Sequence, residues 1–188
     1  MKPWWQMWKN FFTPAECAAL KSVALELPAV EGTIGHGGKS EVNPDMRRSV
    51  VRWIPSHQPK WFPLVQTLER LFAMSNAAAW SFDLTTFRDV QFTEYSATEC
   101  GHYDWHEDLS WMAQKANQRK LSLVVQLTNP AEYKGGILEL DHDQPSDNAH
   151  MSQGTVLIFP SFLRHRVTPV TEGVRHTLVT WCEGPAFR

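Results

Sequence analysis

The residues best suited to chemistry lie in one short stretch, Gly101–Asp108, which holds two histidines and three carboxylates. In an extended strand alternate side chains share a face, so His106 and Asp108 can reach one ion while Glu107 points away. Neutral imidazole and carboxylate together suit a borderline divalent metal such as iron or zinc. Two ligands do not complete a site, so this spacing predicts a further protein ligand elsewhere in the chain.

The expected third ligand is His165, which follows the strongly apolar segment 159–163. One alternative pair stays open at this point. His102 and Asp104 repeat the His-x-Asp spacing on the same face of the predicted strand, and spacing alone does not reject them. The other histidines are expected at the surface (His36, His57, His142 and His150) or in a hydrogen-bonded core or surface position (His176).

A buried arginine is predicted ten residues after His165. The segment 174–181 is expected to be a strand, which places Arg175, Thr177 and Trp181 on one face. A buried guanidinium needs an anion, and no acidic residue on a neighbouring strand is an obvious partner. We therefore expect an anionic small molecule to bind at Arg175.

A second predicted strand, 121–127, carries a polar face that also indicates a bound ligand. Its odd-numbered residues are all leucine or valine and are expected to lie under the helices. The other face holds Ser122, Val124 and Gln126, and is expected to line the interior between the sheets. Ser122 and Gln126 would be costly to bury there unless a ligand or water satisfies them.

Two helices are predicted before these strands. Thr13, Pro14 and Glu16 supply an N-cap, a proline in the first turn and a capping-box glutamate, so a helix begins there and Pro28 ends it. A second amphipathic helix is expected within 56–79. Strands are predicted for 4–12, before the first helix, and for 47–54.

The segment 31–45 has no periodicity and is rich in glycine, serine, asparagine and proline, which predicts a loop. A lid over a binding site and plain disorder are both open for it. The segment 109–118 is expected to be a short helix or a loop. Short strand candidates then follow one another closely, as in a sandwich or barrel: 85–95, 103–108, 121–128, 136–141, 155–159, 164–168 and 174–181.

Length and composition fit one domain, because 188 residues can close a single sizeable core. A net charge of −2 gives no general attraction to nucleic acid or anionic membrane, and Arg47, Arg48 and Arg52 form only a local basic cluster. The three cysteines are widely spaced and are expected to be reduced thiols. No signal peptide or membrane span is indicated, so we expect a soluble, cytoplasmic protein with no membrane partner.

The ordered set of motifs resembles the 2-oxoglutarate- and Fe(II)-dependent oxygenases, specifically the prolyl 4-hydroxylase-like branch. The resemblance covers about residues 95–181. It rests on His106-x-Asp108, then Gly135-Gly136-Ile137-Leu138, then His165 and Arg175. Tyr103 and Trp105 stand where that family has aromatic residues before the first ligand, which favours His106 and Asp108 over His102 and Asp104.

The resemblance implies the fold and the domain plan. The expected class is mainly β (α+β), a double-stranded β-helix or jelly roll with the N-terminal helices packed on its major sheet. One dioxygenase domain would span residues 1–188, with helical support over 1–80 and a catalytic core over about 82–183.

The resemblance also implies the cofactors and roles. Fe(II) would be held by His106, Asp108 and His165, and would bind 2-oxoglutarate and O₂, with ascorbate as an optional reductant. Arg175 would bind the far carboxylate of 2-oxoglutarate, assisted by Thr177 and by Tyr95 or Gln126. Gln126 or Val125 stands where the family often has a tyrosine, so carboxylate binding is expected to differ in detail. The remaining pocket candidates are Tyr103, Trp181, Arg47 and Arg48.

The implied reaction is hydroxylation of a C–H bond with release of succinate and CO₂. A peptidyl proline in a peptide or protein is the leading substrate. The open alternatives are the same chemistry on a nucleic acid, a nucleotide or a small metabolite, a zinc hydrolase, and a non-enzymatic metal-binding jelly-roll module. Arg175 discriminates against a hydrolase, which needs no buried arginine for a dicarboxylate. The sequence leaves the oligomeric state open.

Overall fold

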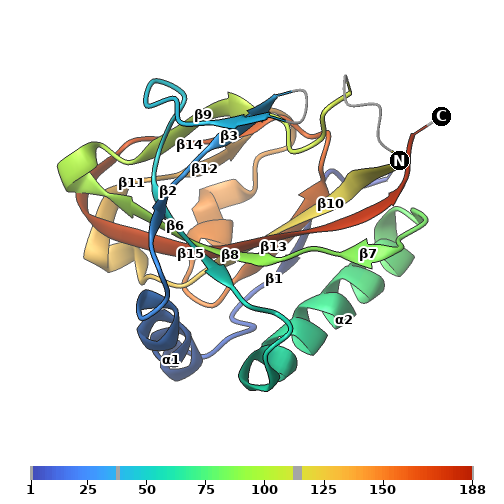
Figure 1. Cartoon of the computed structure of the whole chain (residues 1–188), viewed down its shortest axis with the longest axis horizontal. Coiled ribbons are helices and arrows are strands. Elements are labelled where there is room, and N and C mark those ends of the chain that lie inside the picture. Colours follow the sequence, from blue (N-terminus) through green and yellow to red (C-terminus); the bar gives the residue numbers. More distant parts are fainter. Residues whose placement is uncertain (1, 37–38, 112–115, 188) are drawn as a thin grey trace.

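A computed structural model describes residues 2–36, 39–111 and 116–187. Two antiparallel sheets face each other, and both helices pack against the outer face of the larger one (Figure 1). The larger sheet has nine strands, in the order β1-β13-β10-β15-β8-β6-β2 with β7 and β11 also paired to β15. The smaller sheet has the order β12-β14-β9-β5, and β3 and β4 form a separate hairpin. This is the predicted double-stranded β-helix.

The helices are α1 (Pro14–Leu25) and α2 (Phe62–Ala79), with short 3₁₀ turns at η1 (Pro59–Trp61), η2 (Ala97–Glu99), η3 (Pro130–Glu132) and η4 (Ser146–Met151). The strands of the first half are β1 (Gln6–Trp8), β2 (Val30–Glu31), β3 (Ile34–His36), β4 (Lys39–Glu41), β5 (Arg47–Arg48), β6 (Val50–Ile54), β7 (Thr86–Phe87) and β8 (Val90–Ser96). Those of the second half are β9 (His102–His106), β10 (Asn117–Gln126), β11 (Tyr133–Gly135), β12 (Leu138–Leu140), β13 (Val156–Pro160), β14 (His165–Val167) and β15 (Val170–Pro185).

Alternation along β10 separates two cores, as predicted. Leu121, Leu123 and Val125 are fully buried in the core between the larger sheet and the helices. Val124 belongs to the second core, between the sheets. The side chains that face the space between the sheets can therefore build a site on a support that both cores hold rigid.

The two predicted helices are confirmed. At the start of α1 the Glu16 amide donates to Thr13 Oγ1 over 3.2 Å, and the Thr13 amide donates to Glu16 Oε2 over 2.8 Å. This capping box satisfies two backbone donors that would otherwise lack a partner. Helix α2 buries one apolar stripe against the sheet, formed by Leu64, Leu68, Leu71 and Phe72.

The loop expected over 31–45 is wrong in part, because seven of its fifteen residues belong to β2, β3 and β4. Ile34 pairs with Glu41 and Gly35 with Ser40 across the β3–β4 hairpin, whose tip at 37–38 lies outside the described residues. The strands are too short and too polar to show an alternating pattern, which explains why the sequence did not indicate them.

The strand predicted for 47–54 is two strands that belong to different sheets. Arg47 pairs with Tyr103 of β9, whereas Val50 pairs with Glu94 of β8, so the chain crosses between the sheets at Ser49. The strand predicted for 4–12 is limited to β1, because Asn10 adopts a left-handed conformation with φ 50°. No helix occurs in the described part of 109–118, where 112–115 lie outside the described residues.

The first 80 residues supply strands β1, β2, β5 and β6 as well as the helices, so the expected support region is also part of both sheets. None of the helices in the described residues is long and apolar enough to span a membrane.

Candidate active site

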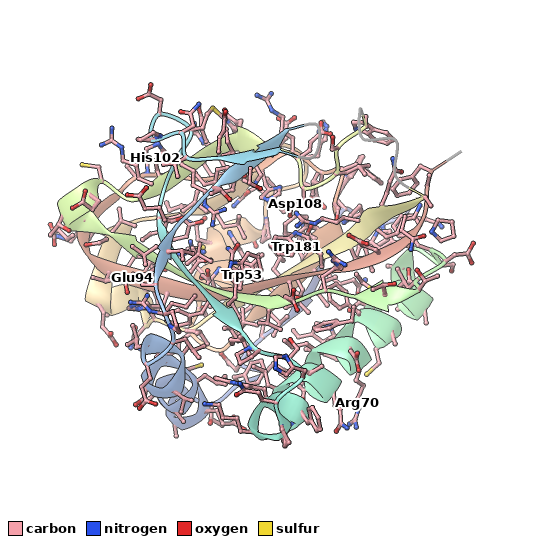
Figure 2. The ribbon with its side chains drawn as sticks, in the orientation of Figure 1. Trp53, Arg70, Glu94, His102, Asp108 and Trp181 are labelled. Carbon is pink, nitrogen blue, oxygen red and sulfur yellow. The ribbon has the colours of Figure 1, made fainter. Side chains whose placement is uncertain are left out.

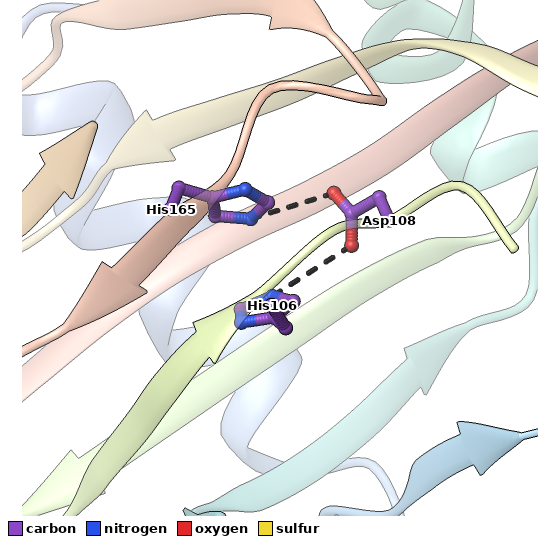
Figure 3. A group of neighbouring side chains, drawn as sticks. All are labelled: His106, Asp108 and His165. Carbon is purple, nitrogen blue, oxygen red and sulfur yellow. Dashed lines mark ion pairs between the residues drawn. The ribbon is translucent and has the colours of Figure 1, made fainter. Parts of the chain in front are cut away.

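The three predicted ligands converge at the end of the smaller sheet. His106 is the last residue of β9, Asp108 follows two residues later, and His165 is the first residue of β14. Antiparallel pairing sets His165 directly opposite His106. One nitrogen or oxygen atom from each side chain lies within 4.8 Å of the other two, which is compact enough to hold one ion (Figure 3).

Hydrogen bonds set both imidazoles to present the same nitrogen. His106 Nδ1 lies 2.7 Å from the Asp104 carbonyl, and His165 Nδ1 lies 2.9 Å from the Leu163 carbonyl. A carbonyl only accepts, so each Nδ1 carries the proton and each Nε2 keeps a free lone pair. The two Nε2 atoms face Asp108, at 3.9 Å from Oδ1 for His106 and 3.6 Å from Oδ2 for His165.

The charge states also suit a divalent cation. Burial, followed by the neighbouring His165, lowers the pKa of His106 to about 3, so this imidazole is neutral at physiological pH. Burial alone would raise the pKa of Asp108, but the two histidines, Arg119 and the Ser122 hydroxyl together lower it to about 2. Imidazole nitrogens beside an ionised carboxylate are the donor set of a two-histidine, one-carboxylate metal site.

Ser122 orients the Asp108 carboxylate, a role that the sequence did not suggest. Its hydroxyl donates to Asp108 Oδ2 over 2.7 Å and lies 2.9 Å from the Ser161 hydroxyl. Both serines are fully buried. The polar face of β10 had indicated that Ser122 needs a partner, but that partner is a carboxylate of the chain rather than a ligand or water.

Arg119 was also missed as a site residue. Its Nη1 lies 3.9 Å from Asp108 Oδ1, and its guanidinium lies over the indole of Trp181, 3.8 Å from the ring centroid. Figure 2 shows Asp108 and Trp181 close together in the space between the sheets. Trp181 is buried, and its Nε1–H has no acceptor among the described residues.

Arg175 lies in the same interior with most of its guanidinium unpaired. The side chain is 1% exposed, and Nη2 donates to Gln126 Oε1 over 3.0 Å. Nε and Nη1 have no partner in the described part of the chain. An unpaired buried guanidinium is costly, so these donors fit a carboxylate supplied by a ligand. Thr177, two residues along β15, lines the same cavity.

Tyr133 completes the surroundings of Arg175 and was not predicted. Burial raises the pKa of Tyr133, while the positive charge of the neighbouring Arg175 opposes this shift. The phenol is therefore a neutral hydroxyl beside the guanidinium. The Tyr95 ring lies 5.5 Å from the Arg175 guanidinium carbon. Tyr133 shortly precedes Gly135 and Gly136, which offered the only sequence signal for its location.

A cavity of about 710 Å³ joins the two sets of residues. Most of the predicted site residues line it: His106, Asp108, His165, Arg175, Thr177, Tyr95, Tyr103, Trp181 and Arg47. Gln126 reaches the site only through Arg175. Arg48 lies outside the cavity, because neighbouring strand residues point to opposite faces; it is exposed, and its Nε donates to the Pro44 carbonyl.

The alternative pair His102 and Asp104 does not join the cluster. The register of β9 against β14 shifts between His106 and Tyr103. Because of this shift, the side chains of Tyr103 and His106 both point toward the cavity. His102 instead lies near the carbonyls of Cys100 and Asp45, well apart from Asp108 in Figure 2. Asp104 is exposed and accepts from the Trp105 amide. The expectation that both pairs share one face was wrong because of this β-bulge.

His150 also departs from its expected surface position. It is fully buried in η4, and its Nε2 lies 2.6 Å from the Leu138 carbonyl. His176 is hydrogen bonded as expected, with Nε2 at 3.3 Å from Glu94 Oε2.

Comparison with known proteins agrees with this geometry. The family model for the 2OG-Fe(II) oxygenase superfamily matches residues 90–183, half of the chain. A PKHD-type hydroxylase of Synechococcus sp. (strain CC9311) is 40% identical over 83 residues, which cover 44% of this chain and 37% of the relative. A PKHD-type hydroxylase of Prochlorococcus marinus (strain NATL2A) is 32% identical over 111 residues, or 58% of this chain and 48% of the relative. The chain thus spans less than half the length of these curated relatives.

Two solved structures share the fold over nearly the whole chain. A Pseudomonas putida prolyl-4-hydroxylase is 19% identical, with a TM-score of 0.71 and coverage of 97% of this chain and 94% of the other. A viral collagen prolyl hydroxylase from Paramecium Bursaria Chlorella virus-1 is 20% identical, with a TM-score of 0.71 and 97% coverage of both chains. The family model covers all three residues of the metal cluster and Arg175. This chain therefore belongs to the 2OG-Fe(II) oxygenase superfamily.

Proposed function

We propose that this protein is an Fe(II)- and 2-oxoglutarate-dependent dioxygenase that hydroxylates a prolyl residue in a peptide or protein. One observation carries the proposal. A two-histidine, one-carboxylate cluster and a buried arginine with unpaired Nε and Nη1 line one cavity. A zinc hydrolase or a passive metal-binding module would need the first feature but not the second.

The residues have distinct roles in this proposal. His106, Asp108 and His165 would hold Fe(II) as its protein ligands. Arg175 would bind the far carboxylate of 2-oxoglutarate through its two unpaired nitrogens, with the hydroxyls of Thr177 and Tyr133 nearby. When bound, Fe(II), 2-oxoglutarate and O₂ would supply the oxidising chemistry, in which the oxo-acid yields succinate and CO₂ and one oxygen atom enters a C–H bond.

The protein's other contribution is to enclose the reaction. Tyr103 and Trp181 form aromatic walls of the cavity, and Ile34 and Gly35 of the β3 strand line it from the hairpin side. Enclosure keeps water away from reactive species formed during the oxidation. The same walls leave room for an extended segment of a substrate.

A peptide substrate is supported by the relatives. A prolyl hydroxylase from Trichoplax adhaerens, solved in complex with a hypoxia inducible factor oxygen degradation domain peptide fragment, shares the fold with a TM-score of 0.72 at 15% identity. The fold alone does not fix a substrate, because specificity resides in the groove rather than in the scaffold. The proposal for proline therefore depends on a direct test.

The test is a succinate-release screen with Fe(II) and 2-oxoglutarate, with and without ascorbate. Proline-containing peptides are compared with oligonucleotides, nucleotides and small metabolites, and mass spectrometry identifies the product. We expect peptide-dependent succinate release and the gain of one oxygen on proline. An oxygen gain confined to a nucleobase or metabolite, with every peptide inert, would replace the substrate while keeping the reaction class.

A further inference from the structure

Arg47 is a second positively charged side chain that the proposed reaction leaves without a partner. It lies on β5, is 7% exposed and lines the cavity. Its Nε donates to Ser49 Oγ over 2.8 Å and its Nη1 donates to the Thr33 carbonyl over 3.0 Å. Neither of these hydrogen bonds involves Nη2. All the protein partners of this guanidinium are therefore uncharged.

The position of the guanidinium is fixed closely. A side chain on Gly32 would place its Cβ 2.6 Å from Arg47 Nε and 2.2 Å from Ser49 Oγ, so the backbone there leaves no spare room. The Arg47 guanidinium carbon lies 4.7 Å from the centroid of the Tyr103 ring. The same ring stacks on His106, with centroids 3.5 Å apart. Arg47 is thus held one aromatic ring away from the metal cluster.

Each of the other two arginines that line the cavity already has an assigned anionic partner. Arg119 pairs with Asp108, and Arg175 is assigned to the carboxylate of 2-oxoglutarate. Within the described part of the chain, no carboxylate lies within 4.0 Å of the Arg47 guanidinium, whereas Arg52 and Arg119 each have one. Burying an unpaired charge is unfavourable, so its retention beside the cavity points to an anionic group that arrives with the substrate.

Resting on the proposed function, we propose that Arg47 binds an aspartate or glutamate side chain of the peptide substrate, close to the reacting residue. An extended peptide advances about 3.5 Å per residue, so the acidic residue would lie one or two positions away. A planar guanidinium with its remaining nitrogen free is suited to hydrogen bonding with a carboxylate.

A nucleic acid is the less suitable anion. Its binding depends on several phosphate contacts along a basic surface. This chain has a net charge of −2, and the neighbouring Arg48 is exposed on the other face of β5. One fixed guanidinium inside a cavity matches one carboxylate better than a chain of phosphates.

The test uses short proline-centred peptides that differ only in glutamate, glutamine or lysine beside the proline. Binding to protein loaded with Mn(II) and 2-oxoglutarate is measured by calorimetry, so the readout does not require turnover. We expect glutamate peptides to bind at least about 30-fold more tightly than glutamine peptides, as for a buried charge pair. Arg47→Gln should abolish this preference, Arg47→Lys should retain part of it, and the matched Arg48→Gln variant should keep it.

Three results would overturn the inference. These are equal binding of glutamate and glutamine peptides by the unmodified protein, an equal loss for all peptides in Arg47→Gln, and tight binding confined to oligonucleotides. Retained 2-oxoglutarate binding by Arg47→Gln shows that the variant is folded. Absence of succinate formation would count against the dioxygenase proposal, whereas loss of the glutamate preference would count against the role of Arg47.

Discussion

Asp108 is the residue whose surroundings the structure defines most completely. Two imidazoles and Arg119 approach its carboxylate at 3.6 to 3.9 Å, but among the described residues only Ser122 donates a hydrogen bond at short range, to Oδ2. Ser161 in turn lies beside the Ser122 hydroxyl. The hydrogen bond from Ser122 occupies Oδ2 and leaves Oδ1 as the better donor for a metal. Residues behind a ligand of this kind commonly tune metal affinity.

Ser122→Ala should therefore weaken Mn(II) or Co(II) binding by about 10-fold or more, as is typical when an outer-shell partner is removed. The loss should be smaller for Ser161→Ala, which removes only the second hydroxyl. Metal titration by calorimetry measures both. Ser75→Ala is the matched control, because Ser75 is also fully buried but bonds Trp8 on the far side of the larger sheet. Unchanged affinity in Ser122→Ala would contradict the orienting role.

Arg175 makes a prediction that separates function from stability. Arg175→Gln should weaken 2-oxoglutarate binding by about 30-fold or more, since the carboxylate loses a buried, hydrogen-bonded charge partner. The unliganded variant should melt at the same temperature or higher, because the substitution removes a buried charge whose Nε and Nη1 are unpaired. Calorimetric binding and thermal unfolding test the two parts. A variant that binds 2-oxoglutarate normally would refute the assignment.

The metal residues were predictable from sequence because they depend on local order: a His-x-Asp spacing, then a histidine after an apolar strand. The unpaired state of Arg175 was predictable for a similar reason, since no acidic residue on a neighbouring strand was an obvious partner, and Glu94 of β8 contacts His176 instead. Tyr133 and the link from Ser122 to Asp108 were not predictable. Each depends on a contact between strands whose register no single-strand pattern determines.

At the scale of elements, the β-bulge in β9 decides which His-x-Asp pair enters the cavity. Regular alternation would have placed His102, Asp104 and His106 on one face, yet the register shift turns Tyr103 and His106 inward together. The β3–β4 hairpin was not predicted either, because two polar three-residue strands carry no periodic signal. Helix α1 carried a capping signal and α2 an amphipathic pattern, and both helices were predicted correctly.

The short η4 turn buries a titratable group that should make stability depend on pH. Burial lowers the pKa of His150, although the Leu138 carbonyl opposes the shift and Arg175 adds to it. The unfolded chain takes up a proton at His150 near pH 6.5, whereas the folded chain resists protonation. The contribution of His150 is therefore fully present above about pH 6.5 and is lost as the pH falls.

Unfolding measurements at several pH values test this effect. Between about pH 7 and 5.5 the free energy of unfolding should fall through protonation of His150 in the unfolded chain, and His150→Gln should remove that part of the pH dependence. His57→Gln, at an exposed position, should leave the pH dependence as it is. Identical pH profiles for the unmodified protein and His150→Gln would show that His150 does not resist protonation in the folded state.

At the scale of the whole molecule, two sheets of unequal size enclose the site while the helices brace the larger sheet from outside (Figure 1). That sheet holds strands from both ends of the chain, because β1 and β15 belong to it with β13 and β10 between them. Short strands that follow one another in the second half indicated a sandwich or barrel, and the motif resemblance implied the double-stranded β-helix. The interleaving of early strands β5 and β6 into both sheets was not predictable, because each pairs with a strand distant in sequence.

The proposed reaction requires that one cavity hold both a metal cluster and a 2-oxoglutarate site. The most direct test follows O₂ consumption and succinate formation in the same sample, with Fe(II) and 2-oxoglutarate supplied. We predict equal amounts of O₂ consumed and succinate formed by the unmodified protein and by His57→Gln, and neither process in Asp108→Ala or His165→Ala. Oxygen consumption indifferent to 2-oxoglutarate, or normal succinate formation by either ligand variant, would contradict the claim.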